Sequence, residues 1–233
     1  MKKIARVIAL IAIFGIIAAG IIASFNHKVP NSEKVWDQAT TVGNIDAKNY
    51  FIVYSDIVCP YCVAFENAII EHEEEFKKYL EDNDILFEVR VSEFLYRYGE
   101  SQSIASHYGS EAIYCAKKQG RFWDYYNSAI TRVWNEYFKA YGKAALSLLS
   151  QQDKNYWISI GTDLGLNEDF ANCVKNGETD EEILAVTQKT GKVISGLPAF
   201  KFNDYVPAGG GGFSLSGTWG NVLDLFDAGL KKH

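Results

Sequence analysis

The chain has 233 residues, of which 48% are hydrophobic and 22% charged, and it contains four cysteines. These proportions are ordinary for a globular protein of one or two domains, and they exclude a disordered chain or a disulfide-dense mini-protein. The net charge of −6 argues against a nucleic-acid-binding protein, which would normally carry a basic patch or stripe.

The net charge is divided unevenly along the chain. Residues 1–24 contain three basic and no acidic residues, which leaves −9 for the remainder. A basic start followed by the apolar run 7–23 is typical of an export signal. The run is long enough for a membrane-spanning helix of about 17–25 residues, and it lacks an Ala-x-Ala cleavage site. We therefore expect 1–24 to be an uncleaved signal-anchor with the rest of the chain outside; a cleaved signal peptide and a buried core helix are the alternatives.

The next segments predict alternating strands and helices. Residues 25–42, with a polar stretch around Pro30, are interpreted as a tether. Residues 50–55 and 85–91 are short runs rich in aromatic and β-branched residues, which predict strands. Between them a helical pattern runs from Pro60 to about Glu81, and we interpret its charged stretch as a solvated helix face with the i,i+4 ion pairs Glu73–Lys77 and Glu74–Lys78.

The second half of the chain is helical and then returns to strands. The helical pattern extends from about residue 101 to 194, and short strands are predicted over 199–202 and 213–215. The glycines at 209–212 lack the Lys-Ser/Thr of a phosphate-binding loop and precede a strand, so they predict a hairpin connection. An amphipathic helix over 219–231 ends the chain.

We expect the reactive residues in Cys59-Pro60-Tyr61-Cys62, between the first strand and the long helix. Pro60 suits the first helical turn, which places the Cys59 sulfur beside the unpaired N–H groups of the helix N-terminus. This position favours a thiolate that acts as nucleophile or leaving group, and Cys62 can then resolve a mixed disulfide. The alternatives are an inert structural disulfide or half of a zinc site, for which no histidine stands in ligand spacing with a cysteine.

These features together resemble the DsbA-like thiol-disulfide oxidoreductases. The resemblance covers nearly all of the chain after the export segment, and it is carried in order by residues 43–48, 54–56, 59–62, 65–66, 115–116, 119–123, 170, 173 and 196–200. It implies an α/β thioredoxin fold with a central mixed sheet flanked by helices and an inserted all-helical subdomain. The thioredoxin-like domain would comprise 43–92 and 195–233, and the insertion 93–194.

The resemblance also implies roles for individual residues. Cys59 would be the exposed attacking cysteine and Cys62 the resolving one. Pro198 would be a cis-proline that packs against the active-site disulfide, with the backbone of Leu197 pairing with the substrate peptide; a trans proline at the strand entrance is the alternative. Glu66 matches an acid near the active site that assists proton transfer.

The chain departs from strongly oxidising relatives at two positions. They carry a histidine where this chain has Tyr61, so we expect a less oxidising couple here. Some relatives bury an acid at the position of Val53, and Asp56 is the nearest candidate for a comparable role. Cys115 and Cys173 match positions where some relatives have cysteine, and we expect them to be bridged; two separate buried thiols are the alternative.

The resemblance therefore implies an extracytoplasmic dithiol oxidase. Its substrates would be exported cysteine-containing polypeptides, and a membrane partner of DsbB or VKOR type would reoxidise it. It would act as a monomer without metal or organic cofactor, in the cell membrane as a single-pass protein or in the periplasm if the signal is cleaved. A reductase or isomerase with the same site, and a non-catalytic peptide-binding module, are the alternatives.

Overall fold

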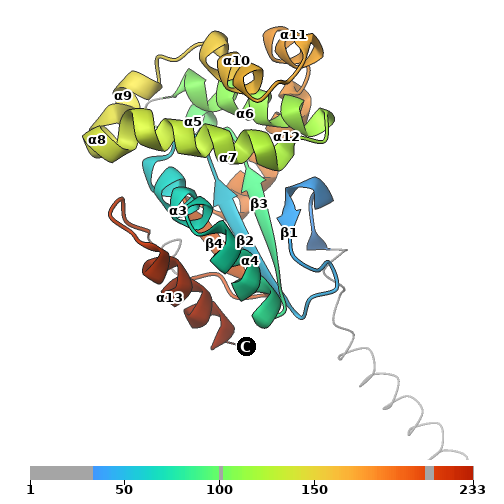
Figure 1. The fold of residues 1–233 in the computed structure, drawn as a ribbon, viewed down its shortest axis with the longest axis vertical. Coiled ribbons are helices and arrows are strands. Elements are labelled where there is room, and N and C mark those ends of the chain that lie inside the picture. The colour runs from blue at the N-terminus through green and yellow to red at the C-terminus, as the bar shows by residue number, and fades with distance from the viewer. Residues whose placement is uncertain (1–33, 100–101, 208–212, 233) are drawn as a thin grey trace, which may run out of the picture. The chain divides into compact units, whose positions relative to one another are not determined.

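The computed structural model describes residues 34–99, 102–207 and 213–232 (Figure 1). The predicted signal-anchor (1–24) and the predicted glycine connection (209–212) lie outside these residues. Within the described ranges, no helix combines the length and apolar character needed to cross a membrane. The main folded unit begins at Val35.

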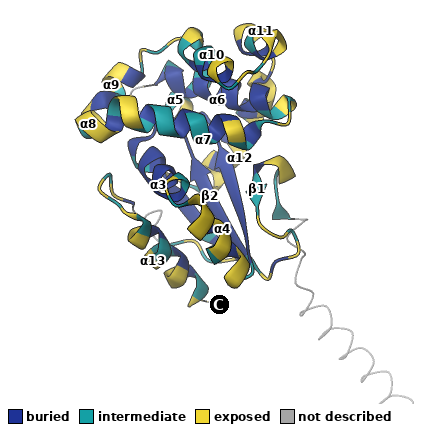
Figure 2. Ribbon diagram, viewed as in Figure 1, coloured by how far each residue is buried: buried dark blue, intermediate teal, exposed yellow. Residues whose placement is uncertain are grey.

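A four-stranded mixed sheet lies at the centre of this unit, in the order β1-β3-β2-β4. Its strands are β1 (Thr41–Val42), β2 (Asn49–Ser55), β3 (Ile85–Val91) and β4 (Ala199–Phe202). The central pair β2 and β3 is parallel, while β1 and β4 are antiparallel to their neighbours. Both central strands are almost entirely buried (Figure 2), so their apolar runs reflect burial on both faces.

Alternate residues of β2 contribute to two hydrophobic clusters. Phe51 and Val53 belong to the large cluster that contains α3 (Pro60–Ile70) and α13 (Trp219–Leu230), and Phe51 stacks on Phe226 with 3.9 Å between ring centroids. Tyr50, Ile52 and Tyr54 point to the other face. This two-residue period fixes the register of the strand.

The predicted helix over 60–81 is two helices, α3 and α4 (Glu73–Asp82). The backbone leaves the helical conformation at His72, and three glutamates then occupy the first turn of α4, where negative charge interacts favourably with the helix dipole. Lys77 pairs with Glu73 as predicted. Lys78, however, pairs with Asp82.

The helical insertion covers the carboxyl ends of the two central strands (Figure 1). It consists of α5 (Phe94–Arg97), α6 (Ile104–Lys118), α7 (Phe122–Val133), a π-helical turn (Trp134–Phe138), α8 (Lys139–Tyr141), a 3₁₀ turn (Gly142–Ala145), α9 (Leu146–Leu149), α10 (Lys154–Asp163), α11 (Glu168–Asn176) and α12 (Asp180–Val193). Its buried side chains join the same large cluster as the sheet. The insertion therefore packs directly on the part of the fold that carries the cysteines.

The folded unit starts earlier than the predicted boundary at residue 43. A 3₁₀ turn (Gln38–Thr40) and β1 both belong to the segment that we expected to be a tether. Trp36 holds this segment in place, because its backbone N–H donates to Glu88 (2.8 Å) and its ring lies 3.9 Å from the Arg90 guanidinium. Hence the fold begins within the predicted tether.

The prediction of a strand over 213–215 is wrong. Residues 213–214 are irregular and Leu215 begins a turn, and the described continuation of β4 is a single bridge between Phe202 and Tyr205. The side chain of Phe213 is buried edge-on against Phe65 of α3. Its apolar character reflects this packing contact and not a strand.

Candidate functional site

The Cys59–Cys62 motif lies where β2 passes into α3. Cys59 is the N-cap residue and Pro60 occupies the first helical turn. The Cys59 carbonyl accepts from the Val63 N–H (3.0 Å), and the Cys59 N–H donates to the Asp56 carbonyl (3.0 Å). The cysteine backbone is thus held from both sides at the helix N-terminus, the position that favours a thiolate.

The two cysteines are unbridged and both are buried. Cys59 retains 4% exposure and Cys62 has none, so the expected order holds, but Cys59 is much less exposed than predicted. The insertion packs against the loop that precedes Cys59, through hydrogen bonds from Leu95 and Ser106 to Asp56. Burial raises the pKa of the Cys62 thiol well above its ordinary value, and the hydrogen bond to Cys59 and the charges of Cys59 and Glu66 act in the same direction.

The cis-proline segment faces the motif across a groove of about 520 Å³. Tyr61 and the Leu197–Pro198 pair both line this groove, and the Leu197–Pro198 peptide bond is cis. Val193 and Val206 also line it and remain about half exposed. The structure thus brings two segments more than 130 residues apart to one concave, partly apolar surface next to the cysteines.

Glu66 lies one helical turn after Cys62, on the same face of α3. Its side chain is buried and neither carboxyl oxygen has a hydrogen-bond partner. Burial raises the pKa of Glu66 to about 8, and the nearby hydroxyls of Tyr126 and Ser55 only partly offset this. At neutral pH the carboxyl is therefore protonated and can give up a proton.

Asp56 is also buried, but both of its carboxyl oxygens accept hydrogen bonds. Its carboxyl oxygens accept from the backbone N–H of Val58 (3.0 Å) and Leu95 (2.8 Å) and from the Ser106 hydroxyl (2.6 Å). Burial raises the pKa of Asp56 to about 6, with these hydrogen bonds opposing the shift. The side chain fastens the active-site loop to the insertion.

Three residues of this site were not identified from the sequence. Ser55, Ser106 and Tyr126 surround the two buried acids, and the Tyr126 hydroxyl donates to Ser55 (3.4 Å). No sequence pattern marks a serine or tyrosine on a helix or at a strand end as a site residue, so their place beside the acids is seen only in the tertiary structure. Val53 is fully buried among apolar side chains.

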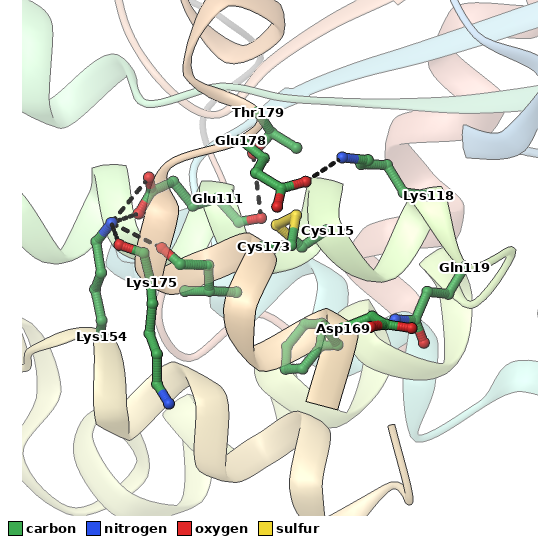
Figure 3. The surroundings of a disulfide bond; sticks show 12 residues. Glu111, Cys115, Lys118, Gln119, Lys154, Asp169, Cys173, Lys175, Glu178 and Thr179 are labelled. Carbon is green, nitrogen blue, oxygen red and sulfur yellow. Dashed lines mark hydrogen bonds and ion pairs between the residues drawn. A yellow bond between two sulfur atoms is a disulfide. The ribbon is translucent and has the colours of Figure 1, made fainter. Parts of the chain in front are cut away.

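Cys115 and Cys173 form a disulfide within the insertion (Figure 3). The bond joins α6 to α11, and its Cα atoms are 5.9 Å apart. Lys118 and Glu178 form an ion pair beside it (2.7 Å). The cysteines are thus divided into one bridged pair in the insertion and one free pair at the start of α3.

The sequence matches the thioredoxin family over residues 37–208. The chain belongs to this family. No curated protein matches the sequence significantly.

Solved structures share the fold at low sequence identity. α-DsbA1 of Wolbachia pipientis has a TM-score of 0.56 at 17% identity, covering 88% of this chain and 99% of that one. BdbD of Bacillus subtilis has a TM-score of 0.55 at 15% identity, covering 82% and 92%. MdbA of Corynebacterium diphtheriae, a thiol-disulfide oxidoreductase, has 0.55 at 17% identity, covering 82% and 90%. The predicted thioredoxin fold is confirmed, and the chain shares this fold with the DsbA-like structures.

Proposed function

We propose that the protein is an extracytoplasmic dithiol oxidase that introduces disulfides into exported polypeptides through Cys59 and Cys62. The observation that carries this proposal is that Tyr61, from the Cys59–Cys62 motif at the N-terminus of α3, lines the same groove as the cis Leu197–Pro198 segment. A redox-active dithiol needs an activated sulfur and a neighbouring surface for an extended substrate. The site offers both.

The reaction starts from the Cys59–Cys62 disulfide. A substrate thiolate attacks the Cys59 sulfur, the bond to Cys62 breaks, and Cys62 leaves as a thiolate. Because Cys62 is fully buried, its thiolate is unfavourable and takes a proton, which protonated Glu66, one helical turn along α3, can supply. A second substrate thiolate then attacks the mixed disulfide and releases Cys59. The substrate gains a disulfide and the enzyme becomes a dithiol.

The compartment and the partners form part of the same proposal. The basic and apolar segment 1–24 is of the type that exports or anchors a protein, and the Cys115–Cys173 disulfide suits an oxidising compartment. The dithiol would be reoxidised by a quinone-linked membrane protein of DsbB or VKOR type. Carbonate extraction of membranes tests the anchor: an anchored chain stays in the pellet, and a chain released to the supernatant has lost its signal or never had a span.

Trapping of substrates tests the redox role. In Cys62→Ala the mixed disulfide at Cys59 cannot be resolved internally, so higher-mass adducts that dithiothreitol releases should accumulate in cells. Cys59→Ala is the matched control and should give none. A peptide-binding module with an inert disulfide would show no difference between the two variants, and this result would refute the redox proposal.

The reduction potential separates an oxidase from a reductase or isomerase. We expect a value above the potential of thioredoxin, about −270 mV, when the protein is equilibrated with glutathione buffers and the dithiol fraction is measured. With Tyr61 in the motif, we also expect a lower potential than in Tyr61→His, because a histidine can stabilise the thiolate. A potential below that of thioredoxin would exclude an oxidase. It would still be compatible with a redox-active site that works as a reductase or isomerase.

A further inference from the structure

A second hollow borders α3 and is separate from the substrate groove. It is a cavity of about 290 Å³ lined by residues of α3, α4, β1, β3 and α7, which Figure 1 labels. No described residue lines both this cavity and the groove that contains Tyr61 and Pro198. The helix that carries the cysteines thus borders two separate spaces, and the proposed redox function uses only the groove.

The walls of this cavity are largely apolar and aromatic. Ile69 and Ile70 come from the last turn of α3, Phe76 from α4 and Phe87 from β3. The half-buried indole ring of Trp123, on α7, completes this part of the wall. Walls of this kind bind small molecules by burying the apolar surface of their rings.

The charged side chains of the wall compensate each other. Glu73 and Lys77 of α4 both line the cavity and form an ion pair at 2.7 Å. Both side chains are about half exposed, so their charges stay in contact with water. Because this pair has no net charge and the other walls are apolar, the cavity favours a neutral molecule over an ion.

One buried polar group of the wall lacks a hydrogen-bond partner. Glu66 lines the cavity, is 3% exposed, and neither of its carboxyl oxygens takes part in a hydrogen bond. The hydroxyl of Tyr126, which also lines the cavity, donates to Ser55. Because the Glu66 carboxyl is protonated at neutral pH, its O–H is a donor without an acceptor among the described residues. A buried donor of this kind costs free energy, and a ligand that accepts its hydrogen bond removes the cost.

We propose that this cavity binds a neutral, ring-containing small molecule whose carbonyl oxygen accepts a hydrogen bond from Glu66. The ring packs against Trp123 and the apolar wall, and the carbonyl supplies the missing acceptor. A carboxylate ligand would place a negative charge beside a buried acid, and an ammonium ligand would lose its hydration, so both bind less well. The site is independent of the redox proposal, because binding involves no thiol exchange.

Titration with 1-indanone, a small bicyclic ketone, tests the site. The full chain is labelled with 5-fluorotryptophan at its five tryptophans, and Cys59 and Cys62 are kept as a disulfide. The fluorine signal of Trp123, assigned by its loss in Trp123→Phe, should shift and saturate as indanone is added. Trp36 packs on the other face of the sheet, so its signal is the internal control and should not move. No shift at Trp123, or equal shifts at both tryptophans, overturns the proposal.

A comparison of 1-indanone with indane identifies the hydrogen bond. The two molecules share one carbon skeleton, and only indanone has the carbonyl. Glu66→Leu removes the donor, so it should lower the affinity for indanone relative to that for indane by about 2- to 10-fold, as expected for one neutral hydrogen bond. Glu73→Gln changes the wall without removing this donor, so it is the matched control and should leave the ratio of affinities unchanged. An unchanged ratio in Glu66→Leu contradicts the proposal.

The pH dependence of binding tests the same contact without Glu66→Leu, should that variant fail to fold. The titratable groups that face Glu66 are Asp56, with a pKa of about 6, Tyr126, whose pKa burial raises well above its ordinary value, and Cys62, which does not titrate as a disulfide. The pKa of Glu66 is about 8, so the affinity for indanone should fall from about pH 7 to 9 as ionisation removes the donor. Glu66→Gln keeps an N–H donor and should bind indanone equally well across this range. An equal decline in both proteins, or none in the unmodified chain, overturns the assignment.

Discussion

At the scale of single residues, the active site contains two buried acids with different surroundings. Asp56 accepts three hydrogen bonds, whereas both oxygens of Glu66 have none. A buried carboxyl without donors is much more stable as the neutral acid, since burial penalises the charged form. Asp56 therefore positions the loop, and Glu66 is the one that stores a proton beside Cys62.

Replacement of Glu66 by glutamine should change how stability depends on pH. Its pKa is 4.5 as an ordinary side chain and about 8 in the fold. Between these pH values the folded state retains a proton that the unfolded state releases, so the free energy of unfolding falls as pH rises. The loss reaches at most about 5 kcal/mol near pH 8. Glu66→Gln should remove this decline, as measured by urea unfolding of the reduced protein from pH 5 to 8.

Glu71→Gln serves as the control for this experiment. Glu71 is an exposed residue at the C-terminus of α3, and its substitution should not remove the decline between pH 5 and 8. The remaining decline in Glu66→Gln should lie between about pH 4 and 6, where Asp56 titrates with its pKa raised to about 6. An unchanged slope up to pH 8 in Glu66→Gln would show that Glu66 is ionised in the fold.

At the scale of elements, local patterns predicted most of the sheet and missed what depends on distant contacts. The strands β3 and β4 have the predicted bounds, because their apolar runs are short and clearly ended. Glu88 and Arg90 alternate with apolar residues in β3, yet both are buried. Glu88 and Arg90 form an ion pair (2.7 Å), and Tyr50, Tyr54 and Trp36 provide further contacts to Arg90 that no local pattern indicates.

In the candidate site, too, the residues close together in the sequence were predicted and those brought in by distant contacts were missed. Spacing alone placed Cys59 and Cys62 at one helix N-terminus, and the resemblance added Glu66 on the same short segment of the chain. Tyr126 and Ser106 reach the site from the insertion, and the sequence gives no indication of where its helices pack. The helix break at His72 was missed for a related reason, since a run of charged residues fits one long helix as well as two.

Removal of the disulfide in the insertion should lower stability without removing the redox site. Its cysteines are 58 residues apart, and closing a loop of this length stabilises by about 4 kcal/mol in the chain-entropy model. The double variant Cys115→Ala/Cys173→Ala should therefore unfold at clearly lower urea concentration and still form mixed disulfides. The double variant Cys59→Ala/Cys62→Ala, compared with the oxidised protein, should lose less, because its loop is short. An equal or greater loss of stability in Cys59→Ala/Cys62→Ala would contradict the chain-entropy model.

At the scale of the whole molecule, the insertion and the thioredoxin-like part share one core. A single hydrophobic cluster includes Phe51 of the sheet, Phe226 of α13 and Trp157 of α10. The insertion approaches the active-site loop closely at Gly109 of α6: a Cβ atom there would lie 2.5 Å from Ile57, two residues before Cys59, and 3.0 Å from Trp157. Because neither side chain has free space, the active-site loop and the insertion constrain each other.

Gly109→Ala should therefore destabilise both parts together. Overpacking costs about 1–3 kcal/mol, which exceeds the gain of up to about 1 kcal/mol from placing alanine in a helix. Gly220→Ala is the matched control, since a Cβ atom at this exposed position of α13 has one ordinary contact at 3.6 Å; it should be neutral or stabilising. In urea, far-UV circular dichroism follows the helices and alkylation of Cys59 follows the active-site loop. Coincident shifts of both signals in Gly109→Ala are expected, and a shift in only one of them would mean that the two parts unfold independently.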